Sequence, residues 1–250
     1  MDGTGGSWSS CTADDGAFDE ASEAFTCTST SLSDGSHTMY VRSTDSLSNM
    51  SSNSSDTFTI DTGGPSVSLT ALTPDPTTNT TPTLSGTATD SYSVLSTVEY
   101  QIDGTSGSWT ACTASDGAFD EVSEAFTCTS STLSQGSHTL YVRSTDALSN
   151  TTSPGSYDSD VFTIDLDGPS LTLTAVSPDP TLNTKPVLTG TAIDGGLPID
   201  YVQFQMDSTT GTWTDCSADD GGFNELSEAF TCTITTALSE ACLLYTSRCV

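Results

Sequence analysis

The chain has 250 residues, of which 33 are Asp or Glu and 4 are Lys or Arg, so its formal net charge at pH 7 is -29. Such a charge repels nucleic acid and anionic bilayers, which excludes both as expected partners. Charged residues make up only 15% of the sequence, and apolar residues alternate with Ser and Thr, which is typical of β-strands and not of disorder.

No apolar run approaches the roughly 20 residues that a membrane-spanning helix needs, so we expect no membrane insertion. The residues after Met1, DGTGGSW, match Asp103 to Trp109 and do not resemble a signal sequence. We therefore expect any export signal to lie outside this sequence.

One segment occurs three times with the same spacing between its two cysteines. Its copies are CTADDGAFDEASEAFTC from Cys11, CTASDGAFDEVSEAFTC from Cys112 and CSADDGGFNELSEAFTC from Cys216, and a tryptophan precedes each copy. The repeat period is about one hundred residues, the size of an immunoglobulin-like sandwich. The sequence therefore predicts a tandem array: residues 1–65 hold the C-terminal part of a repeat, 66–168 a complete repeat, 169–239 the N-terminal part of a third, and 240–250 a tail outside the repeats. We expect the tail to be of artefactual origin, the alternative being a divergent last strand.

In the complete repeat, alternation between turn signals predicts an all-β sandwich of about seven strands. The expected inner residues of the strand over 96–102 are Val98, Tyr100 and Ile102, and those of the strand over 137–145 are Leu140 and Val142. Tyr141 and Arg143 should then face outward. The other strands are expected at 66–72, 83–89, near Trp109 to Cys112, at 126–130 and at 160–165.

Paired cysteines without a histidine cluster indicate disulfides better than zinc sites, and they imply an oxidising compartment. We expect Cys11 to bond Cys27, Cys112 to bond Cys128, and Cys216 to bond Cys232. Closing a loop of about 15 residues contributes roughly 3 kcal/mol in the loop-entropy account. Trp109 is expected to cap the core, the alternative being an exposed platform for carbohydrate.

The motifs PDPTTNTTPTLSGTATD, VEYQIDG, GSHTLYVRSTDALSN and FTIDLDGPS stand in fixed order. Together they resemble the bacterial immunoglobulin-like, or cadherin-like, repeats of large surface and secreted proteins, over all of the chain except its tail. The resemblance implies an extracellular or cell-surface location, with neighbouring repeats of the same chain as the main partners. Many such repeats have Gly-Asn where this chain has Ser149-Asn150.

Calcium is the one candidate cofactor, and none is required. In such arrays the loops that follow two of the strands lie where the chain enters from the preceding repeat, which would bring together Asp61, Asp90 and Asp146. The next junction offers Asp165 and Asp194, with Asp167 nearby and no third acid of the Asp146 type. Carboxylates suit Ca²⁺, but aspartates also initiate turns by accepting backbone hydrogen bonds. The acidic loop between the cysteines offers a weaker calcium site and also reads as a single helical turn.

Catalysis has no motif to support it: His37 and His138 are repeat-equivalent strand residues, and no nucleophile elbow, HExxH or phosphate loop occurs. We therefore expect a non-enzymatic spacer or adhesin-like stalk, stiffened by calcium at its junctions. Two alternatives stay open: a module that binds carbohydrate or protein at a cell surface, and an accessory domain of a secreted hydrolase. An exposed aromatic patch would favour the first alternative.

Overall fold

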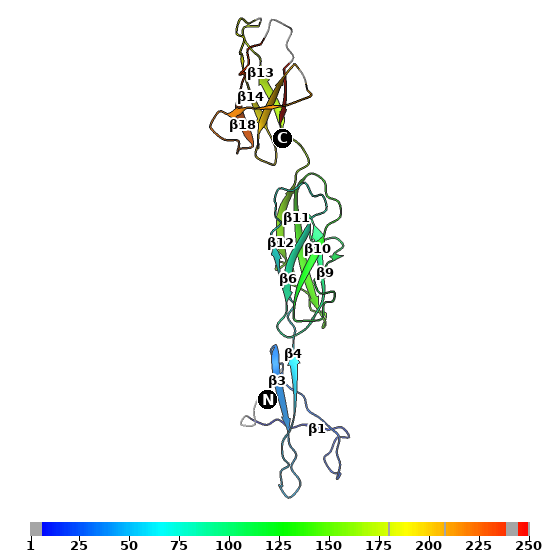
Figure 1. Ribbon diagram of the computed structural model, residues 1–250. Helices are drawn as coiled ribbons and strands as arrows, with labels where there is room; N and C mark the ends of the chain where they lie inside the picture. The colour runs from blue at the N-terminus through cyan, green and yellow to red at the C-terminus, as the bar shows by residue number, and fades with distance from the viewer. Residues whose placement is uncertain (1–6, 180, 208, 239–244, 250) are drawn as a thin grey trace. The chain divides into compact units, whose positions relative to one another are not determined.

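Every regular element of the computed structural model is a β-strand, in the part of the chain that it describes (Figure 1). That part comprises residues 7–179, 181–207, 209–238 and 245–249. The chain divides into two compact units: one contains Met1–Ala71, Thr83–Thr129 and Leu140–Asp160, and the other contains Leu72–Pro82, Ser130–Thr139 and Val161–Val250. This division does not follow the predicted repeat boundaries, which stay a prediction.

The first repeat forms two separate two-stranded sheets. Its strands are β1 (Thr12–Ala13), paired with β2 (Phe25–Thr26), and β3 (Gly35–Val41), paired with β4 (Ser54–Ile60). None of the apolar side chains of β3 and β4 is fully buried. The described part of this repeat, residues 7–65, therefore forms hairpins without a closed core.

The central repeat forms two antiparallel four-stranded sheets, with strand orders β5-β6-β10-β9 and β12-β11-β7-β8. Its eight strands lie close to the seven predicted ranges. The additional strand arises because the short strand predicted near Cys112 is divided into β8 and β9. The predicted all-β, immunoglobulin-like class is confirmed. The strands are β5 (Ser66–Thr70), β6 (Thr83–Thr89), β7 (Leu95–Ile102), β8 (Thr110–Ala111), β9 (Thr113–Ala114), β10 (Ser123–Thr129), β11 (Gly136–Asp146) and β12 (Asp158–Ile164).

The alternation of apolar and polar residues along the strands matches an alternation of buried and more exposed side chains. On β11, Leu140 and Val142 are buried while Tyr141 and Arg143 are half-buried on the opposite face, as predicted. On β7, Val98 and Tyr100 are buried, but Ile102 is only half-buried. Leu95, which lies outside the predicted strand, is also buried, because a register shift between Thr145 and Asp146 interrupts the alternation at this end of β7.

The largest core side chain of β10, Phe126, depends on a glycine in the neighbouring strand. Phe126 is fully buried, and its register partner on β6 is Gly86. A Cβ on Gly86 would lie 2.6 Å from the Phe126 ring and 2.3 Å from the Ser68 carbonyl oxygen. Because real Cβ atoms do not come so close, the aromatic ring fits only over a glycine. Gly190 and Phe230 repeat this arrangement in the third repeat.

All three predicted disulfides form. In the central repeat, Cys112 lies between β8, which pairs with β7, and β9, which pairs with β10 in the other sheet. The amide of Cys112 donates a hydrogen bond to the Val98 carbonyl, 2.8 Å away. Its sulfur bonds Cys128 of β10, which is fully buried. The disulfide therefore holds the chain at the residue where it crosses from one sheet to the other.

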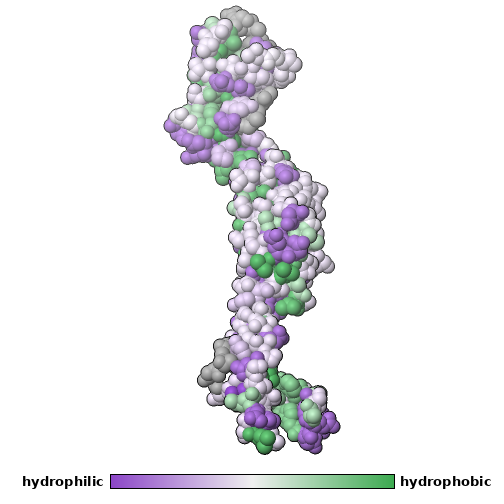
Figure 2. All heavy atoms as spheres, turned by 60° about the horizontal axis from the view of Figure 1, so that its bottom comes forward, coloured by the Kyte–Doolittle hydropathy of each residue, from purple (hydrophilic) through white to green (hydrophobic). Residues whose placement is uncertain are grey.

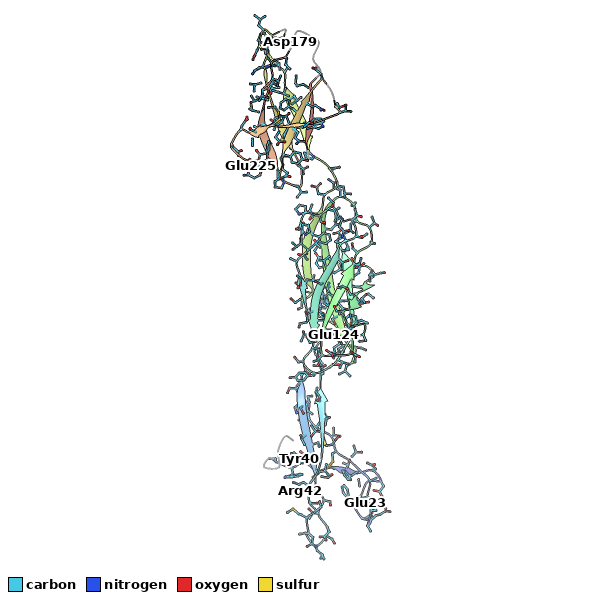
Figure 3. All side chains as sticks on the ribbon, in the orientation of Figure 1. Glu23, Tyr40, Arg42, Glu124, Asp179 and Glu225 are labelled. Carbon is cyan, nitrogen blue, oxygen red and sulfur yellow. A yellow bond between two sulfur atoms is a disulfide. The ribbon has the colours of Figure 1, made fainter. Side chains whose placement is uncertain are left out.

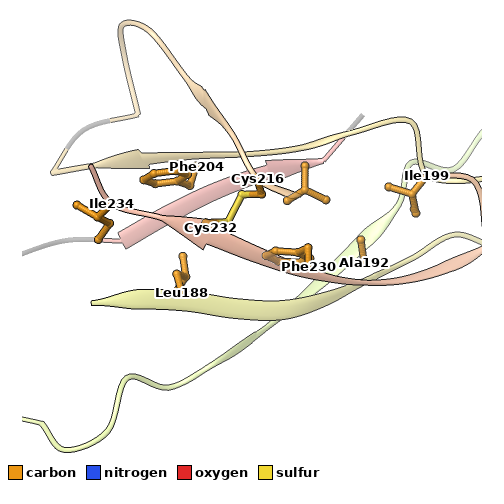
Figure 4. Close-up of a cluster of buried hydrophobic side chains, with 9 residues drawn as sticks. Leu188, Ala192, Ile199, Phe204, Cys216, Phe230, Cys232 and Ile234 are labelled. Atoms are coloured by element: carbon orange, nitrogen blue, oxygen red, sulfur yellow. A yellow bond between two sulfur atoms is a disulfide. The ribbon is translucent and has the colours of Figure 1, made fainter. Parts of the chain in front are cut away.

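The third repeat has the same two sheets in shorter form, with orders β13-β14-β18-β17 and β16-β15-β19. Its core is a cluster around the Cys216–Cys232 disulfide that includes Phe204 and Phe230 (Figure 4). The strands are β13 (Ser170–Thr174), β14 (Val187–Ile193), β15 (Val202–Met206), β16 (Thr214–Asp215), β17 (Ser217–Ala218), β18 (Ser227–Thr233) and β19 (Tyr245–Cys249).

The C-terminal tail was predicted to lie outside the fold, and that prediction is wrong for residues 245–249. These residues form β19, which pairs with β15 so that Arg248 lies opposite Gln203. The register is that of β11 against β7, where Arg143 lies opposite Glu99. This register fits the alternative of a divergent last strand, whose main-chain groups complete the ladder at the edge of β15. Residues 240–244 and 250 lie outside the described residues, and the origin of the tail stays a prediction.

The described residues contain no helix long and apolar enough to span a membrane. Near-white residues of intermediate hydropathy cover much of the face in Figure 2, with scattered purple and green side chains between them. This surface reflects the many Ser and Thr residues on the outward positions of the strands.

Removing the central disulfide should destabilise the central repeat specifically. We expect the double variant Cys112→Ala/Cys128→Ala to lose about 2–4 kcal/mol of unfolding free energy, since the closed loop and the buried sulfur of Cys128 are both lost. Urea unfolding followed by hydrogen exchange at β10 amides measures this loss. The matched control is Cys11→Ala/Cys27→Ala, which should leave the exchange of β10 unchanged.

Candidate functional site

Three carboxylates from three separate segments lie together in the first compact unit. Asp61 follows β4, Asp90 follows β6, and Asp146 ends β11, and one carboxylate oxygen from each lies within 4.8 Å of the others. These are the three residues for which the sequence predicted convergence. Their role as metal ligands stays a prediction.

Asp146 and Asp90 each organise the loop that follows their strand. Asp146 Oδ1 accepts hydrogen bonds from the amides of Leu148 (2.9 Å) and Asn150 (2.8 Å), and its Oδ2 accepts one from Asn150 Nδ2 (2.9 Å). Asp90 Oδ1 accepts from the amides of Tyr92 (2.8 Å) and Ser93 (3.0 Å). The turn-forming role that the sequence left open therefore accounts for one oxygen of Asp90 and for both oxygens of Asp146.

The loop after Asp146 also explains a departure from the family pattern. Ser149 has φ of 71°, in the left-handed region, and its repeat equivalent Ser48 has φ of 69°. Glycine adopts that conformation without a Cβ clash, so the Gly-Asn of many related repeats suits this turn better. Here the hydrogen bonds to Asp146 hold serine in the same place.

Asp61 differs from its two neighbours because one of its oxygens has no protein partner. Oδ1 accepts a hydrogen bond from the Gly63 amide at 3.1 Å, while Oδ2 is buried and has no hydrogen-bond partner among the described residues. Burial raises the pKa of Asp61, and the negative charges of Asp90, Asp146 and Asp34 raise it further. A buried carboxylate oxygen among like charges is what a bound cation would stabilise, so this donor set fits Ca²⁺.

A similar pair lies in the second compact unit, where Asp165 follows β12 and Asp194 follows β14. Both side chains are buried, with exposed fractions of 5% for Asp165 and 9% for Asp194. Asp194 Oδ1 accepts from the amides of Gly196 and Leu197, each at 2.8 Å, and these bonds lower its pKa, with a further contribution from Asp165. Asp165 Oδ2 is buried, and no residue in the described part of the chain is its hydrogen-bond partner. Within the described part of the chain, no third carboxylate joins this pair.

The acidic loops hold two more carboxylate groups: Asp116, Asp120 and Glu124, and Asp220, Glu225 and Glu228. In each group a buried glutamate fixes the loop: Glu124 Oε1 accepts from the amides of Asp120 (3.1 Å) and Glu121 (2.9 Å), and Glu228 does the same for residues 224 and 225. The prediction of a helical turn was wrong, because β10 already begins at Ser123. Glu124 and Glu225 are labelled in Figure 3.

A stack of arginine on tryptophan, which was not predicted from the sequence, recurs in two repeats. The guanidinium carbon of Arg143 lies 4.4 Å from the ring centroid of Trp109, and that of Arg42 lies 4.0 Å from Trp8. Arg143 also bonds Glu99 at 2.8 Å, and Tyr157 meets the Trp109 ring edge-on at 5.2 Å. The shared spacing of Trp and Arg in repeats one and two was the available signal.

This stack changes the predicted role of Trp109. Arg143 lies on the outward face of β11, opposite the buried Leu140 and Val142. Trp109 is therefore half-buried on the outer face of its sheet and does not cap the core. Because a guanidinium covers one ring face, Trp109 does not offer an open platform for a sugar ring.

The fold and the loop geometry define a class of protein, the immunoglobulin-like β-sandwich repeat. Residues 65–142 match the family described as bacterial Ig domain, which is not a catalytic family. The central part of the chain is thus a bacterial immunoglobulin-like domain, which confirms the resemblance. A comparison with curated proteins gave no match.

Truncating Arg143 should weaken the central repeat without disturbing its core. We expect Arg143→Ala to cost about 1–2 kcal/mol, from the loss of the stack on Trp109 and of a partly exposed ion pair. Chemical unfolding monitored by tryptophan fluorescence measures the loss. Arg143→Lys should recover only part of it, because lysine lacks the planar guanidinium. Full recovery by Arg143→Lys, or an Arg143→Ala variant as stable as the parent chain, would show that the planar stack contributes nothing.

The raised pKa of Asp61 predicts how stability depends on pH when no cation is bound. A carboxyl whose folded pKa lies above its unfolded value contributes stability below the unfolded pKa, and this contribution is lost as pH rises through the folded pKa. In chelator at neutral pH, Asp61→Asn should therefore melt at a higher temperature than the parent chain. The difference should shrink as the pH falls toward about 4.

Asp45→Asn is the matched control, because hydrogen bonds from Asn49 lower the pKa of Asp45 and so reverse the sign. Asp45→Asn should be less stable than the parent chain at neutral pH. The difference in stability should shrink as the pH falls below the ordinary pKa of an aspartate. Melting curves across this range measure both effects. Parallel curves for Asp61→Asn and the parent chain would contradict the assigned burial of Asp61.

Proposed function

We propose that the chain is a segment of an extracellular or cell-surface protein in which immunoglobulin-like repeats act as spacers. The bacterial Ig domain match supports a structural or surface role, and three buried or half-buried disulfides suit an oxidising environment. The strong negative charge keeps such repeats soluble and discourages their collapse onto one another. Adjacent repeats of the same chain are the expected partners.

Calcium bound by Asp61, Asp90 and Asp146 would stiffen the segment between the first two repeats. The observation that carries this proposal is the buried Oδ2 of Asp61, which has no hydrogen-bond partner among the described residues, beside two carboxylates that their own loops hold in place. Asp61 belongs to the linker after β4, and the other two belong to strand ends of the central repeat. A cation shared by them would tie the linker to the sandwich.

The Asp165 and Asp194 pair is the weaker of the two proposed sites. It offers two carboxylates where the first site offers three, and affinity for Ca²⁺ rises with the number of charged oxygen ligands. We therefore expect this pair to bind calcium only at a higher concentration than the site of Asp61, Asp90 and Asp146 needs.

The alternative of a carbohydrate-binding module receives less support. Such a module needs an open aromatic surface, and Trp109 is covered by Arg143 and Tyr157. Trp8 is likewise stacked with Arg42. The role of accessory domain in a secreted hydrolase is compatible with the spacer function, since a spacer can position a catalytic module.

Thermal melting with and without calcium tests the proposed site. At millimolar Ca²⁺ we expect the melting temperature of the central repeat to rise by several degrees, because a ligand that binds only the folded state stabilises it. Mg²⁺ at the same concentration should have a smaller effect, since it dehydrates reluctantly.

Asp146→Asn should abolish the shift and Asp45→Asn should keep it. The two aspartates make the same three hydrogen bonds, to the amides at positions two and four further on and to an asparagine side chain, but only Asp146 belongs to the carboxylate group. An unchanged melting temperature in the parent chain, or equal shifts in both variants, would remove the calcium proposal and leave the spacer function untouched.

A further inference from the structure

The linker between the first two repeats, residues 61–65, lies against the loop that follows β11. At Gly64 the two backbones touch: a Cβ there would be 2.1 Å from the Thr151 carbonyl oxygen and 2.9 Å from the Thr152 amide nitrogen. Because a side chain does not fit so close to a backbone, this approach requires glycine. The adjacent Gly63 differs, since the nearest atoms to a Cβ there lie at 3.8 Å, an ordinary contact distance.

Two side chains of the same loop bond the two ends of the linker. Thr152 is 2% exposed, and its Oγ1 donates a hydrogen bond to the Pro65 carbonyl at 2.7 Å. The amide of Thr152 donates to the Ser144 carbonyl of β11 at 2.9 Å, which holds this residue in place. At the other end of the linker, Asn150 Nδ2 donates to the Asp61 carbonyl at 3.4 Å. The loop therefore contacts the linker at both ends and in its middle.

The first repeat holds the same linker from the other side. Asp34 lies just before β3, and its Oδ1 accepts hydrogen bonds from the amide (3.0 Å) and the hydroxyl (2.9 Å) of Thr62. Gln135 is the equivalent residue before β11, and it bonds the linker that follows the central domain. Its Oε1 accepts from the Leu166 amide at 3.0 Å, and its Nε2 donates to Asp167 at 2.6 Å. Two side chains of different chemistry thus bond the same position of two linkers.

A segment with two adjacent glycines is flexible when nothing holds it. We propose that Asp34 on one side and residues 150–152 on the other form a clasp that keeps the linker rigid without a bound cation. The atoms of the clasp are distinct from the carboxylate oxygens of Asp61, Asp90 and Asp146. The proposal therefore goes beyond the calcium site, and a cation there would add to a segment that is already fixed.

Backbone NMR relaxation of the 250-residue chain in chelator tests the clasp. We expect the amides at positions 63 and 64 to have order parameters near about 0.85, the value of rigid backbone. Gly64→Ala should lower them below about 0.6, because the added Cβ forces the linker away from Thr151. Gly63→Ala is the matched control: it makes the same change one residue earlier, where the Cβ has room, and should leave the order parameters near those of the parent chain.

A second pair of variants tests the hydroxyl. Thr152→Val keeps the size of the side chain and removes the bond to Pro65, so it should also lower the order parameter at position 64. Thr151→Val is its control, because the Thr151 hydroxyl bonds Thr145 and not the linker.

A third pair tests the side of the clasp that belongs to the first repeat. Asp34→Ala should lower the order parameter of the Thr62 amide, since both bonds from Thr62 are lost. Asp34→Asn should preserve it, because the amide oxygen still accepts hydrogen bonds.

Either of two results would overturn the proposal: order parameters below about 0.6 along the linker of the parent chain in chelator, or equal effects of Gly64→Ala and Gly63→Ala. The order parameters of β10 show whether a variant has unfolded, and if Gly64→Ala has, Thr152→Val against Thr151→Val decides. A melting temperature that does not respond to calcium would remove the calcium site and leave the clasp standing.

Discussion

The central domain depends on the way one short strand is held between two sheets. The segment from Thr110 to Ala114 pairs first with β7 and then with β10, and it changes sheet at Cys112. The bond from Cys112 to Cys128 fixes that residue against the core strand β10, and the Cys112 amide is fixed to β7. Because both sheets are tied at one residue, their inner faces are held in contact, and the alternating apolar residues of β6, β7, β10 and β11 become one core.

The same disulfide accompanies less complete burial where fewer strands are described. The first repeat has its disulfide, but its apolar strand residues remain half-buried because few strands lie opposite them. The third repeat retains more strands and a buried core around its disulfide. A local cross-link therefore does not replace the area of apolar surface that a complete pair of sheets removes from water.

Much of the fold followed from the sequence because two-residue periodicity has a direct physical meaning in a half-buried strand. Val98, Tyr100, Leu140 and Val142 were assigned to the core by this pattern, and the cysteine pairs by their identical spacing. The convergence of Asp61, Asp90 and Asp146 followed from topology, once the strand order of such sandwiches was assumed. These features are encoded locally or by repetition.

Other features could not be read because they depend on contacts between distant residues. Glu124 belongs to a strand and caps its loop from the buried side, which residue order alone does not distinguish from a helical turn. The stack of Arg143 on Trp109 requires the two side chains to meet on the outer face of a sheet. β19 lies at the edge of β15 and pairs with it through main-chain groups, and the tail departs from the repeat pattern by which the other strands were predicted.

Native-state hydrogen exchange on the 250-residue chain tests most directly whether the central domain is closed by this crossing strand. Amides of β6, β7, β10 and β11 should exchange most slowly of all, and the amide of Cys112 should be protected to the same degree as those of β10. If the amides of β3 and β4 were protected equally well, or if Cys112 exchanged as fast as a loop residue, the central claim would be contradicted.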